Sequence, residues 1–513
     1  EGGLIEAFID ENELWSIHAA LANVHFPRST EALESARRRF IFQELLVLQL
    51  ALATRKHQLE SSARAEPITT TAQIDARIRR LFEFELTDGQ ERAIKEIVAD
   101  MDRTIPMNRL LQGDVGSGKT MVAIYAMLVA TAQGFQAALM APTEVLARQH
   151  YQTLSKALAQ ARVKVALWTG QLTAAERRET QAQIESGEVN LVVGTQALIH
   201  SDCDYAKLGL VVIDEQHKFG VQQRARLRDA AAAPHYLVMT ATPIPRTVAM
   251  TAFGDLDVST LRDHPPGRQE VKSYLVKESE SERWWEFFRK QLRQGRQGFV
   301  VTPRLNESES QDVMSVEESF EALCNGELEE FRLQLIHGRM TTEEKQEVMD
   351  SFRSGETQVL VSTTVIEVGV DVPNASVMTI ESADRFGLAQ LHQLRGRVGR
   401  GNFGGFVGVF SENVDDYLKR KRLEAFVSTS DGFELAELDF QLRGPGDLMG
   451  TKQHGLPPLR IADLVRDEDV LVEARKLARS LVEEDRLAEP EFAGLLRQVM
   501  IRYGQKFELG DVG

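Results

Sequence analysis

Cysteine, basic charge and long apolar runs are all scarce in this 513-residue chain, and each scarcity narrows what the protein can be. Its two cysteines, Cys203 and Cys324, lie far apart and match no metal-binding or redox spacing. This argues against a disulfide framework and favours a reducing, cytoplasmic setting. No apolar run approaches the roughly 18 residues that a membrane span requires, and no signal peptide is visible. We therefore expect no membrane contact.

Basic residues are outnumbered by acidic ones, with 60 Lys and Arg against 76 Asp and Glu, so the formal net charge is −16. A net charge of this sign argues against non-specific binding to polyanions. It leaves room for a nucleic-acid site, because a groove needs only local Lys and Arg to neutralise the phosphates it contacts. The length predicts about three domains.

One glycine-rich stretch fits the pattern G-x-x-x-x-G-K-[ST], in which backbone N–H groups cradle phosphates, the lysine reaches the β and γ phosphates and the hydroxyl binds Mg²⁺. Residues 108–111 before it can form a short buried strand, and the Ala-, Met- and Leu-rich run 121–131 after it favours a helix. That order places an anion site at a helix N-terminus. A glycine turn with a solvated lysine is the alternative. We predict a nucleoside triphosphate site with Mg²⁺, made by Gly113, Asp114, Gly116, Ser117, Gly118, Lys119 and Thr120.

The rest of the chain divides into four predicted parts. Residues 1–63 are a helical segment with a linker, and residues 413–513 are mostly helical. Between them, residues 64–266 and 267–412 each alternate short β-rich runs with helices, which is typical of a parallel sheet covered by helices. The fold class is therefore α/β with two tandem lobes. Because the second lobe has no glycine-lysine loop, we predict that one nucleotide binds in a cleft between the lobes.

The predicted strands are short apolar runs, as expected for strands buried on both faces. They are 108–111, 137–140, 163–167, 191–193, 210–213 and 236–239 in the first lobe, and 298–301, 333–336, 358–361 and 376–379 in the second. Ahead of the lobes, Ser29 or Thr30 can cap a long helix that carries the basic cluster 37–39. A solvated helix face explains this cluster better than a DNA contact does.

Two further clusters suit phosphate chemistry. Asp214 and Glu215 follow an apolar strand, where one carboxylate can hold Mg²⁺ through water and the other can polarise the attacking water. By itself such a pair is more often a surface turn, but it lies in the same α/β unit as the glycine-rich loop. In the second lobe, residues 393–400 contain several arginines. We predict that Arg397 and Arg400 share one helix face and act as arginine fingers, rather than forming a solvated helix end.

Taken together, these motifs resemble superfamily 2 helicases and translocases, which have two RecA-like lobes. The resemblance implies that Phe84 and Gln90 read adenine. It implies that Thr143, Gly194 and Thr195 grip one DNA strand by its phosphates, and that Thr242 couples hydrolysis to lobe movement. Second-lobe contacts to DNA and nucleotide would come from His337, Gly338 and the run 363–371, with Thr363, Gly369 and Asp371. Nucleotide contacts would also come from Gln393, Arg397 and Arg400.

A more specific resemblance is to the RecG family of bacterial DNA translocases. It rests on residues 107–112, 214–221 and 241–247, and above all on 441–447 with 450–455. Without the family, the last stretch would be a loop, because its glycines and proline cannot hold a helix. In the family, a similar segment after a helical hairpin converts lobe closure into a pull on duplex DNA, and this role falls on Arg443.

The departures from the family pattern are few. Lys218 and Lys452 stand where arginine is expected, and His454 stands where serine is more usual; lysine keeps the charge but lacks the planar fork of arginine. RecG proteins also carry an N-terminal wedge domain of OB type, which binds separated strands on aromatic side chains. Nothing ahead of Glu1 supplies it, so we expect a motor that is a fragment of a longer chain.

The resemblance implies an ATP-dependent DNA helicase that regresses stalled forks and migrates Holliday junctions in recombination and repair, with 3′-to-5′ polarity. ATP and Mg²⁺ would be its cofactors, and branched and duplex DNA its partners, together with a single-stranded-DNA-binding protein. We expect a monomer associated with the bacterial nucleoid. One alternative keeps the motor but makes it the translocase of a transcription-repair coupling factor. Another, from a different class, is a P-loop enzyme acting on a small molecule.

Overall fold

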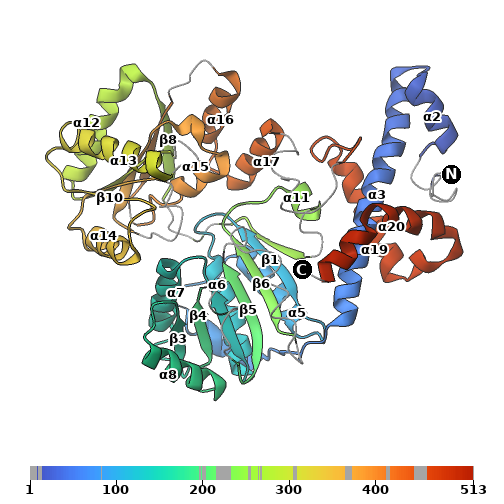
Figure 1. The fold of residues 1–513 in the computed structure, drawn as a ribbon, viewed down its shortest axis with the longest axis horizontal. Coiled ribbons are helices and arrows are strands. Elements are labelled where there is room, and N and C mark those ends of the chain that lie inside the picture. The colour runs from blue at the N-terminus through green and yellow to red at the C-terminus, as the bar shows by residue number, and fades with distance from the viewer. Residues whose placement is uncertain are drawn as a thin grey trace.

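The computed structural model describes residues 9, 14–82, 84–195, 198, 204–214, 233–251, 256–263, 265, 269–303, 309–363, 372–401, 403–411, 416–443 and 459–511. They form two α/β lobes and a helical unit that draws on both ends of the chain (Figure 1). The predicted class, α/β with two tandem parallel-sheet lobes, is confirmed. Within the described ranges, no helix has the length and apolar character needed to cross a bilayer.

Lobe 1 is built on a seven-stranded sheet in the order β3-β4-β2-β5-β6-β1-β7, with every pair parallel. Alternate residues supply two cores: Leu111 packs under one set of helices and Leu110 faces the opposite side of the sheet. The strands are β1 Asn108–Gly113, β2 Gln136–Met140, β3 Val165–Trp168, β4 Leu191–Gly194, β5 Leu208–Asp214, β6 His235–Thr240 and β7 Asp257–Leu261.

The helices of lobe 1 cover both faces of this sheet. They are α4 Ala72–Arg79, α5 Asp88–Met101, α6 Lys119–Ala132, α7 Glu144–Ala157 and α8 Ala174–Glu185, while α11 Arg246–Thr251 follows β6 and packs against the long helix α3 Thr30–Ser62. The predicted strands of this lobe are all present, although β3 begins two residues later than predicted. Strand β7 was missed because it lies at the sheet edge and mixes polar with apolar residues, so its sequence has no apolar run.

Lobe 2 has a six-stranded parallel sheet in the order β10-β11-β9-β12-β13-β8. Helices α12 Ser281–Arg293 and α13 Glu309–Cys324 pack on one face, and α14 Thr342–Ser354 and α15 Leu388–Arg395 on the other. The strands are β8 Val271–Val276, β9 Gln297–Val301, β10 Leu333–Ile336, β11 Val359–Ser362, β12 Ala375–Ile380 and β13 Gly405–Phe410. Of these, β8 and β13 were not predicted.

The glycines of β13 explain why that strand was missed. Gly408 pairs with its neighbours in the sheet, yet a Cβ there would collide with the indole ring of Trp284 from α12. Residue 408 is glycine because the Trp284 ring occupies the space that a side chain would need. A strand that contains glycines lacks a continuous apolar run, so the sequence predicts it only weakly.

The helical unit combines α2 Ile17–His25 and α3 Thr30–Ser62 with α19 Glu468–Glu483 and α20 Ala493–Asp511. Figure 1 shows α3 and α19 side by side, and one hydrophobic core contains residues from both ends of the chain. The N-terminal and C-terminal segments therefore pack together. A separate hairpin, α16 Tyr417–Ser428 and α17 Gly432–Arg443, packs on lobe 2 beside α15.

The basic cluster on α3 lies in this helical unit, and the predicted solvated face is wrong for Arg39. This side chain is 1% exposed, and its Nη1 donates to Gln43 Oε1 at 2.8 Å. Gln43 in turn donates to Gln498 of α20, and Arg38 pairs with Glu473 of α19 at 2.8 Å. Helices α19 and α20 cover this turn of α3. The sequence did not reveal this cover, because both helices lie more than 400 residues further along the chain. Burial lowers the pKa of Arg39 because it penalises the charged form.

Glu44, one turn further along α3, holds the start of the last described segment. Its carboxylate is buried and accepts the backbone N–H groups of Arg460, Ile461 and Ala462 at 2.9, 2.9 and 3.0 Å. A carboxylate that accepts several N–H groups is a strong, charge-assisted anchor. The chain is therefore fixed to α3 where it enters the C-terminal helices.

We expect Glu44→Ala to destabilise the helical unit by about 3 kcal/mol, because three backbone N–H groups, one buried and two partly buried, lose their charged acceptor. The measurement is the urea midpoint, followed by far-ultraviolet circular dichroism. Glu473→Ala is the matched control: it removes an exposed ion pair with Arg38 and should cost less than about 1 kcal/mol. Equal midpoints for the two variants would contradict the anchoring role of Glu44.

Candidate active site

The glycine-rich residues 113–120, here called the phosphate loop, lie at the carboxyl edge of the lobe 1 sheet. Strand β6 lies between β1 and β5, with Gln112 opposite Thr240 and Asp214 opposite Met239. All three strands are parallel, so the phosphate loop, the segment after Thr240 and the carboxylate of Asp214 reach the same edge. Ligands of open α/β sheets bind at this edge.

The backbone of the phosphate loop requires glycine at two positions. Gly116 and Gly118 have φ of 79° and 83°, in the left-handed region that residues with a Cβ rarely adopt. Gly118 also lies against Gln90 Nε2, where a Cβ would collide. Helix α6 begins directly after Gly118 without a side-chain cap. The N–H groups of its first turn therefore lie where an anion would bind.

The lysine of the phosphate loop is held by the loop itself. Lys119 Nζ donates to the carbonyl oxygens of Gly113 and Asp114, each at 2.8 Å, and the side chain is buried. Ser117 Oγ is also buried and makes no hydrogen bond within the described residues. The phosphate loop thus combines a buried ammonium group, a buried hydroxyl and a helix N-terminus. This combination suits phosphate oxygens.

Gln90 and Phe84, the residues for which an adenine contact was predicted, lie in different surroundings. Gln90 is 1% exposed; its Oε1 accepts the N–H of Thr87 at 2.9 Å, and its Nε2 donates to Ser117 O at 2.9 Å. It therefore supports the phosphate loop from α5. Phe84 is 49% exposed and stacks on Phe82 with ring centroids 6.0 Å apart, which leaves an aromatic surface in solvent. The adenine contacts stay a prediction.

Asp214 ends β5, and its Oδ2 lies 2.7 Å from Nε2 of His150 on α7. The hydroxyl of Thr120 and the carboxylate of Asp214 are hard oxygen donors of the kind that Mg²⁺ prefers. Among the described residues, no group of three or more His, Cys, Asp or Glu side chains could hold a metal. The oxygen donors of Thr120 and Asp214 fit Mg²⁺, which usually binds through one or two carboxylates and substrate phosphates and keeps several waters. The predicted base Glu215 lies outside the described residues.

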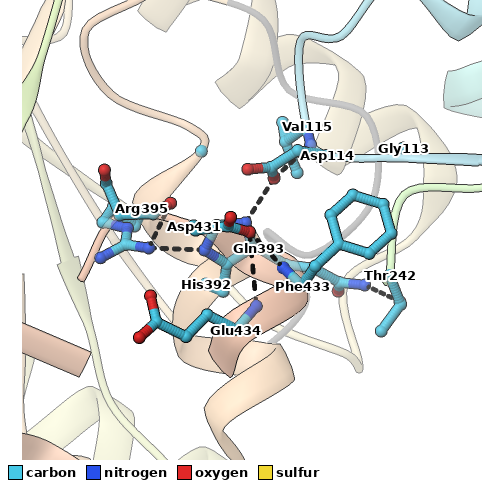
Figure 2. A network of polar contacts seen from close by, with 12 residues as sticks. Gly113, Asp114, Val115, Thr242, His392, Gln393, Arg395, Asp431, Phe433 and Glu434 are labelled. Carbon is cyan, nitrogen blue, oxygen red and sulfur yellow. Dashed lines mark hydrogen bonds and ion pairs between the residues drawn. The ribbon is translucent and has the colours of Figure 1, made fainter. Parts of the chain in front are cut away.

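Lobe 2 reaches the phosphate loop through α15, as Figure 2 shows. Gln393 Nε2 donates to Thr242 Oγ1 at 2.6 Å, and His392 Nε2 hydrogen-bonds Asp114 Oδ1. Just after the helix, Gly396 lies so close to Val115 that an added Cβ would stand 2.7 Å from the valine Cβ. The two lobes therefore meet at the phosphate loop itself.

The prediction that Arg397 and Arg400 share one helix face is wrong. Helix α15 ends at Arg395, and the chain continues through i→i−3 bonds before Gly399 turns it with φ of 71°. Arg400 Nε donates to Gly396 O at 2.8 Å. The helix ends at Arg395, with Gly396 as its C-cap, before either arginine, and this effect outweighed the spacing argument.

Arg395, the first arginine of the cluster, is buried and serves the fold. It donates to the carbonyl oxygens of Phe426, Thr429 and Ser430 at 3.0, 2.7 and 3.1 Å. These residues end α16 or follow it. Arg395 therefore joins α15 to the α16–α17 hairpin.

The residues with predicted DNA contacts in lobe 1 follow strand ends. Thr143 caps α7 by accepting the N–H of Leu146 at 3.4 Å, and Thr195 follows β4. Gly194 has a structural reason to be glycine, because a Cβ would collide with the carbonyl oxygen of Trp168 on the neighbouring strand.

In lobe 2, His337 and Gly338 follow β10, and the Gly338 carbonyl accepts Lys345 Nζ at 2.9 Å. Thr363 follows β11 and is 3% exposed. Arg443 is the last residue of α17. Gly369, Asp371 and the glycine-rich stretch 444–458 lie outside the described residues.

Sequence reasoning missed two polar residues of this site, His392 and His150. His392 directly precedes the predicted Gln393–Arg400 cluster, so its position was a usable signal. His150 had none, since it lies 64 residues before its partner Asp214.

Three family models match consecutive parts of the chain. The DEAD/DEAH box helicase model matches residues 87–251, and the helicase conserved C-terminal domain matches residues 285–402. The model described as ATP-dependent DNA helicase RecG, domain 3, C-terminal, matches residues 429–504. These ranges contain the phosphate loop, α15 and α17, respectively.

Curated relatives and a solved structure agree with these matches. The chain is 46% identical to the ATP-dependent DNA helicase RecG of Synechocystis over 93% of its own length and 57% of that protein. It is 44% identical to the RecG of Bacillus subtilis over 95% of its own length and 71% of that protein. A structure of RecG bound to a three-way DNA junction matches with a TM-score of 0.73 and 42% identity, over 91% of this chain and 61% of that one. This chain therefore spans between about half and three quarters of its relatives' length.

We expect Gly118→Ala to weaken ATP binding at least tenfold, roughly the effect of a 1.4 kcal/mol loss, because the new methyl group collides with Gln90 beneath the phosphate loop. The measurement is equilibrium titration with a fluorescent ATP analogue. Gly134→Ala is the matched control, since Gly134 has φ of 81° but nothing within 4 Å of an added Cβ. It should lower stability by about 1 kcal/mol and leave binding unchanged. Equal affinities for the two variants would contradict this role of Gly118.

Proposed function

Because this chain belongs to the RecG family of ATP-dependent DNA helicases, we propose that it couples ATP hydrolysis to translocation on duplex DNA. The observation that carries the proposal is the meeting of both lobes at the phosphate loop, through Gln393 with Thr242 and His392 with Asp114. A site shared by two lobes converts a change in bound phosphate into movement of one lobe against the other.

Each residue of the site has a proposed task in hydrolysis. Lys119 exchanges its carbonyl partners for β- and γ-phosphate oxygens, while Thr120 and Asp214 hold Mg²⁺. The ion, when bound, neutralises charge on those phosphates. Glu215 orients the attacking water. Arg397 and Arg400, from lobe 2, stabilise the charge that develops in the transition state, with Gln393 positioning that segment. The other proposed nucleotide contacts within the phosphate loop are Gly113, Asp114, Gly116, Ser117 and Gly118. Gly369 and Asp371 contribute contacts from lobe 2, and Phe84 and Gln90 contact the adenine ring.

Coupling to DNA follows from the contacts of α15. This helix contacts the phosphate loop at one side, and its last residue, Arg395, bonds the end of α16 and the turn that follows it. Movement of lobe 2 is therefore passed to the α16–α17 hairpin, and so to Arg443 and the segment after it. We propose that this segment pulls on duplex DNA while Thr143, Gly194, Thr195, His337, Gly338 and Thr363 track one strand.

The proposed substrates are branched and duplex DNA, including stalled forks and Holliday junctions, in recombination and repair. Their support is family membership and the likeness to a RecG solved on a three-way junction. We further propose a monomer that acts at the bacterial nucleoid and contacts a single-stranded-DNA-binding protein. Light scattering tests the first point, and pulldown with the purified binding protein tests the contact.

The deciding experiment is ATP turnover without DNA and with single-stranded, duplex and four-way substrates. We expect stimulation by duplex or branched DNA. A turnover rate that ignores DNA would overturn the proposal and favour a P-loop enzyme of another class. The relatives reported above are RecG proteins, so they favour fork remodelling over transcription-repair coupling; retention of RNA polymerase by the purified chain would reverse that preference.

We expect Lys119→Ala to reduce ATP hydrolysis on the order of 100-fold or more, because the phosphates lose their main cation. DNA binding, measured by fluorescence anisotropy, should be retained. Lys164→Ala, which breaks an exposed pair with Glu188, is the control and should hydrolyse ATP normally. Full hydrolysis by Lys119→Ala would show that the site is assigned wrongly.

Arg443→Ala should keep DNA-stimulated ATP hydrolysis within about twofold of the original rate, since it leaves the phosphate loop intact, yet lose most branch migration on a synthetic four-way junction. Arg420→Ala is the control, because Arg420 is an exposed residue of α16 paired with Glu424. Unimpaired branch migration by Arg443→Ala would argue against its role in coupling.

A further inference from the structure

His392 lies between a cation and an anion that belong to different parts of the molecule (Figure 2). Its Nδ1 is 2.7 Å from Arg395 Nη2, and its Nε2 hydrogen-bonds Asp114 Oδ1 across the lobe boundary. A guanidinium group has only donors, so Nδ1 must accept. The imidazole is therefore neutral, and its one proton is on Nε2, where it is donated to Asp114.

Asp114 is an unusual neighbour for a polyphosphate. Its carboxylate is buried within the phosphate loop, with a side chain 7% exposed, and Oδ1 also accepts the N–H of Val115 at 2.6 Å. A negative charge so placed opposes the charge of an incoming triphosphate, and low solvent access strengthens that repulsion. His392 donates a hydrogen bond to the Asp114 carboxylate, and the guanidinium of Arg395, on the other side of the imidazole, supplies a positive charge that balances the charge of that carboxylate.

We propose that His392 is a positioning residue through which lobe 2 sets the affinity of the phosphate loop for nucleotide. It balances the carboxylate of Asp114 and holds it in one orientation. The loop is therefore ready for phosphate only when α15 is docked on it. This inference rests on the proposed function and adds to it a residue outside the nucleotide-contacting set.

The first residue of α17 lies against the same imidazole. Gly432 packs against His392, and an added Cβ would collide with Nε2 of the ring. The same Cβ would also collide with Pro243 Cγ, 2.9 Å away. A methyl group at residue 432 would therefore crowd both the imidazole and Pro243, which disturbs the histidine contact without changing the chemistry of the ring.

The test compares His392→Gln with His392→Phe. Glutamine keeps an amide donor for Asp114 and a carbonyl acceptor for Arg395, whereas phenylalanine keeps the volume and offers neither. We expect His392→Phe to weaken equilibrium binding of a fluorescent nonhydrolysable ATP analogue about tenfold, within the usual range for coupling between sites. KM for ATP should rise in parallel, and His392→Gln should stay near the original affinity. Circular dichroism verifies that each variant is folded.

Two further variants separate charge balance from packing. Asp114→Asn in the His392→Phe background should recover most of the lost affinity, because the amide removes the buried charge and keeps an oxygen acceptor. Gly432→Ala should reduce affinity in the same direction as His392→Phe, although alanine favours the helix in which it lies.

Unchanged analogue binding in His392→Phe, or no recovery on adding Asp114→Asn, would overturn the role of His392. These outcomes are distinct from failure of the proposed function. If the unmodified chain showed no DNA-stimulated hydrolysis, the function would fail, while analogue affinity would still report on His392.

Discussion

The hydrogen bonds between α15 and the edge of lobe 1 are the interaction on which the rest of the structure depends. Gln393 bonds Thr242, and His392 bonds Asp114, so one short helix of lobe 2 contacts two loops at the carboxyl edge of the lobe 1 sheet. One of these loops is the phosphate loop, and the other follows β6, the strand between β1 and β5. The site is therefore shared by both lobes.

A series of contacts connects α15 to the C-terminal helices. Arg395 attaches the helix to the α16–α17 hairpin, and α17 ends at Arg443. Beyond the glycine-rich stretch, Glu44 of α3 anchors the chain again through three backbone N–H groups. The described residues on either side of that stretch are therefore attached to lobe 2 at one end and to the N-terminal helix at the other.

Particular elements show where sequence reasoning succeeded and where it failed. Apolar runs such as 210–213 predicted buried parallel strands, because no other environment suits them. Strand β13 was missed because Gly408 is determined by Trp284, a contact between distant residues. The shared helix face of Arg397 and Arg400 was wrong because α15 ends at Arg395, before either residue. The burial of Arg39 was hidden because its cover comes from the other end of the chain.

By itself, the sequence determined the phosphate loop, the fold class and the family, since each depends on local spacing, turn chemistry or apolar periodicity that a short stretch carries. Only the tertiary structure decided what surrounds these motifs. The pairing of His150 with Asp214 and of His392 with Asp114 joins residues 64 and 278 positions apart. Such pairs have no sequence signature, because the packing of whole lobes, and not the local backbone, brings their side chains within reach.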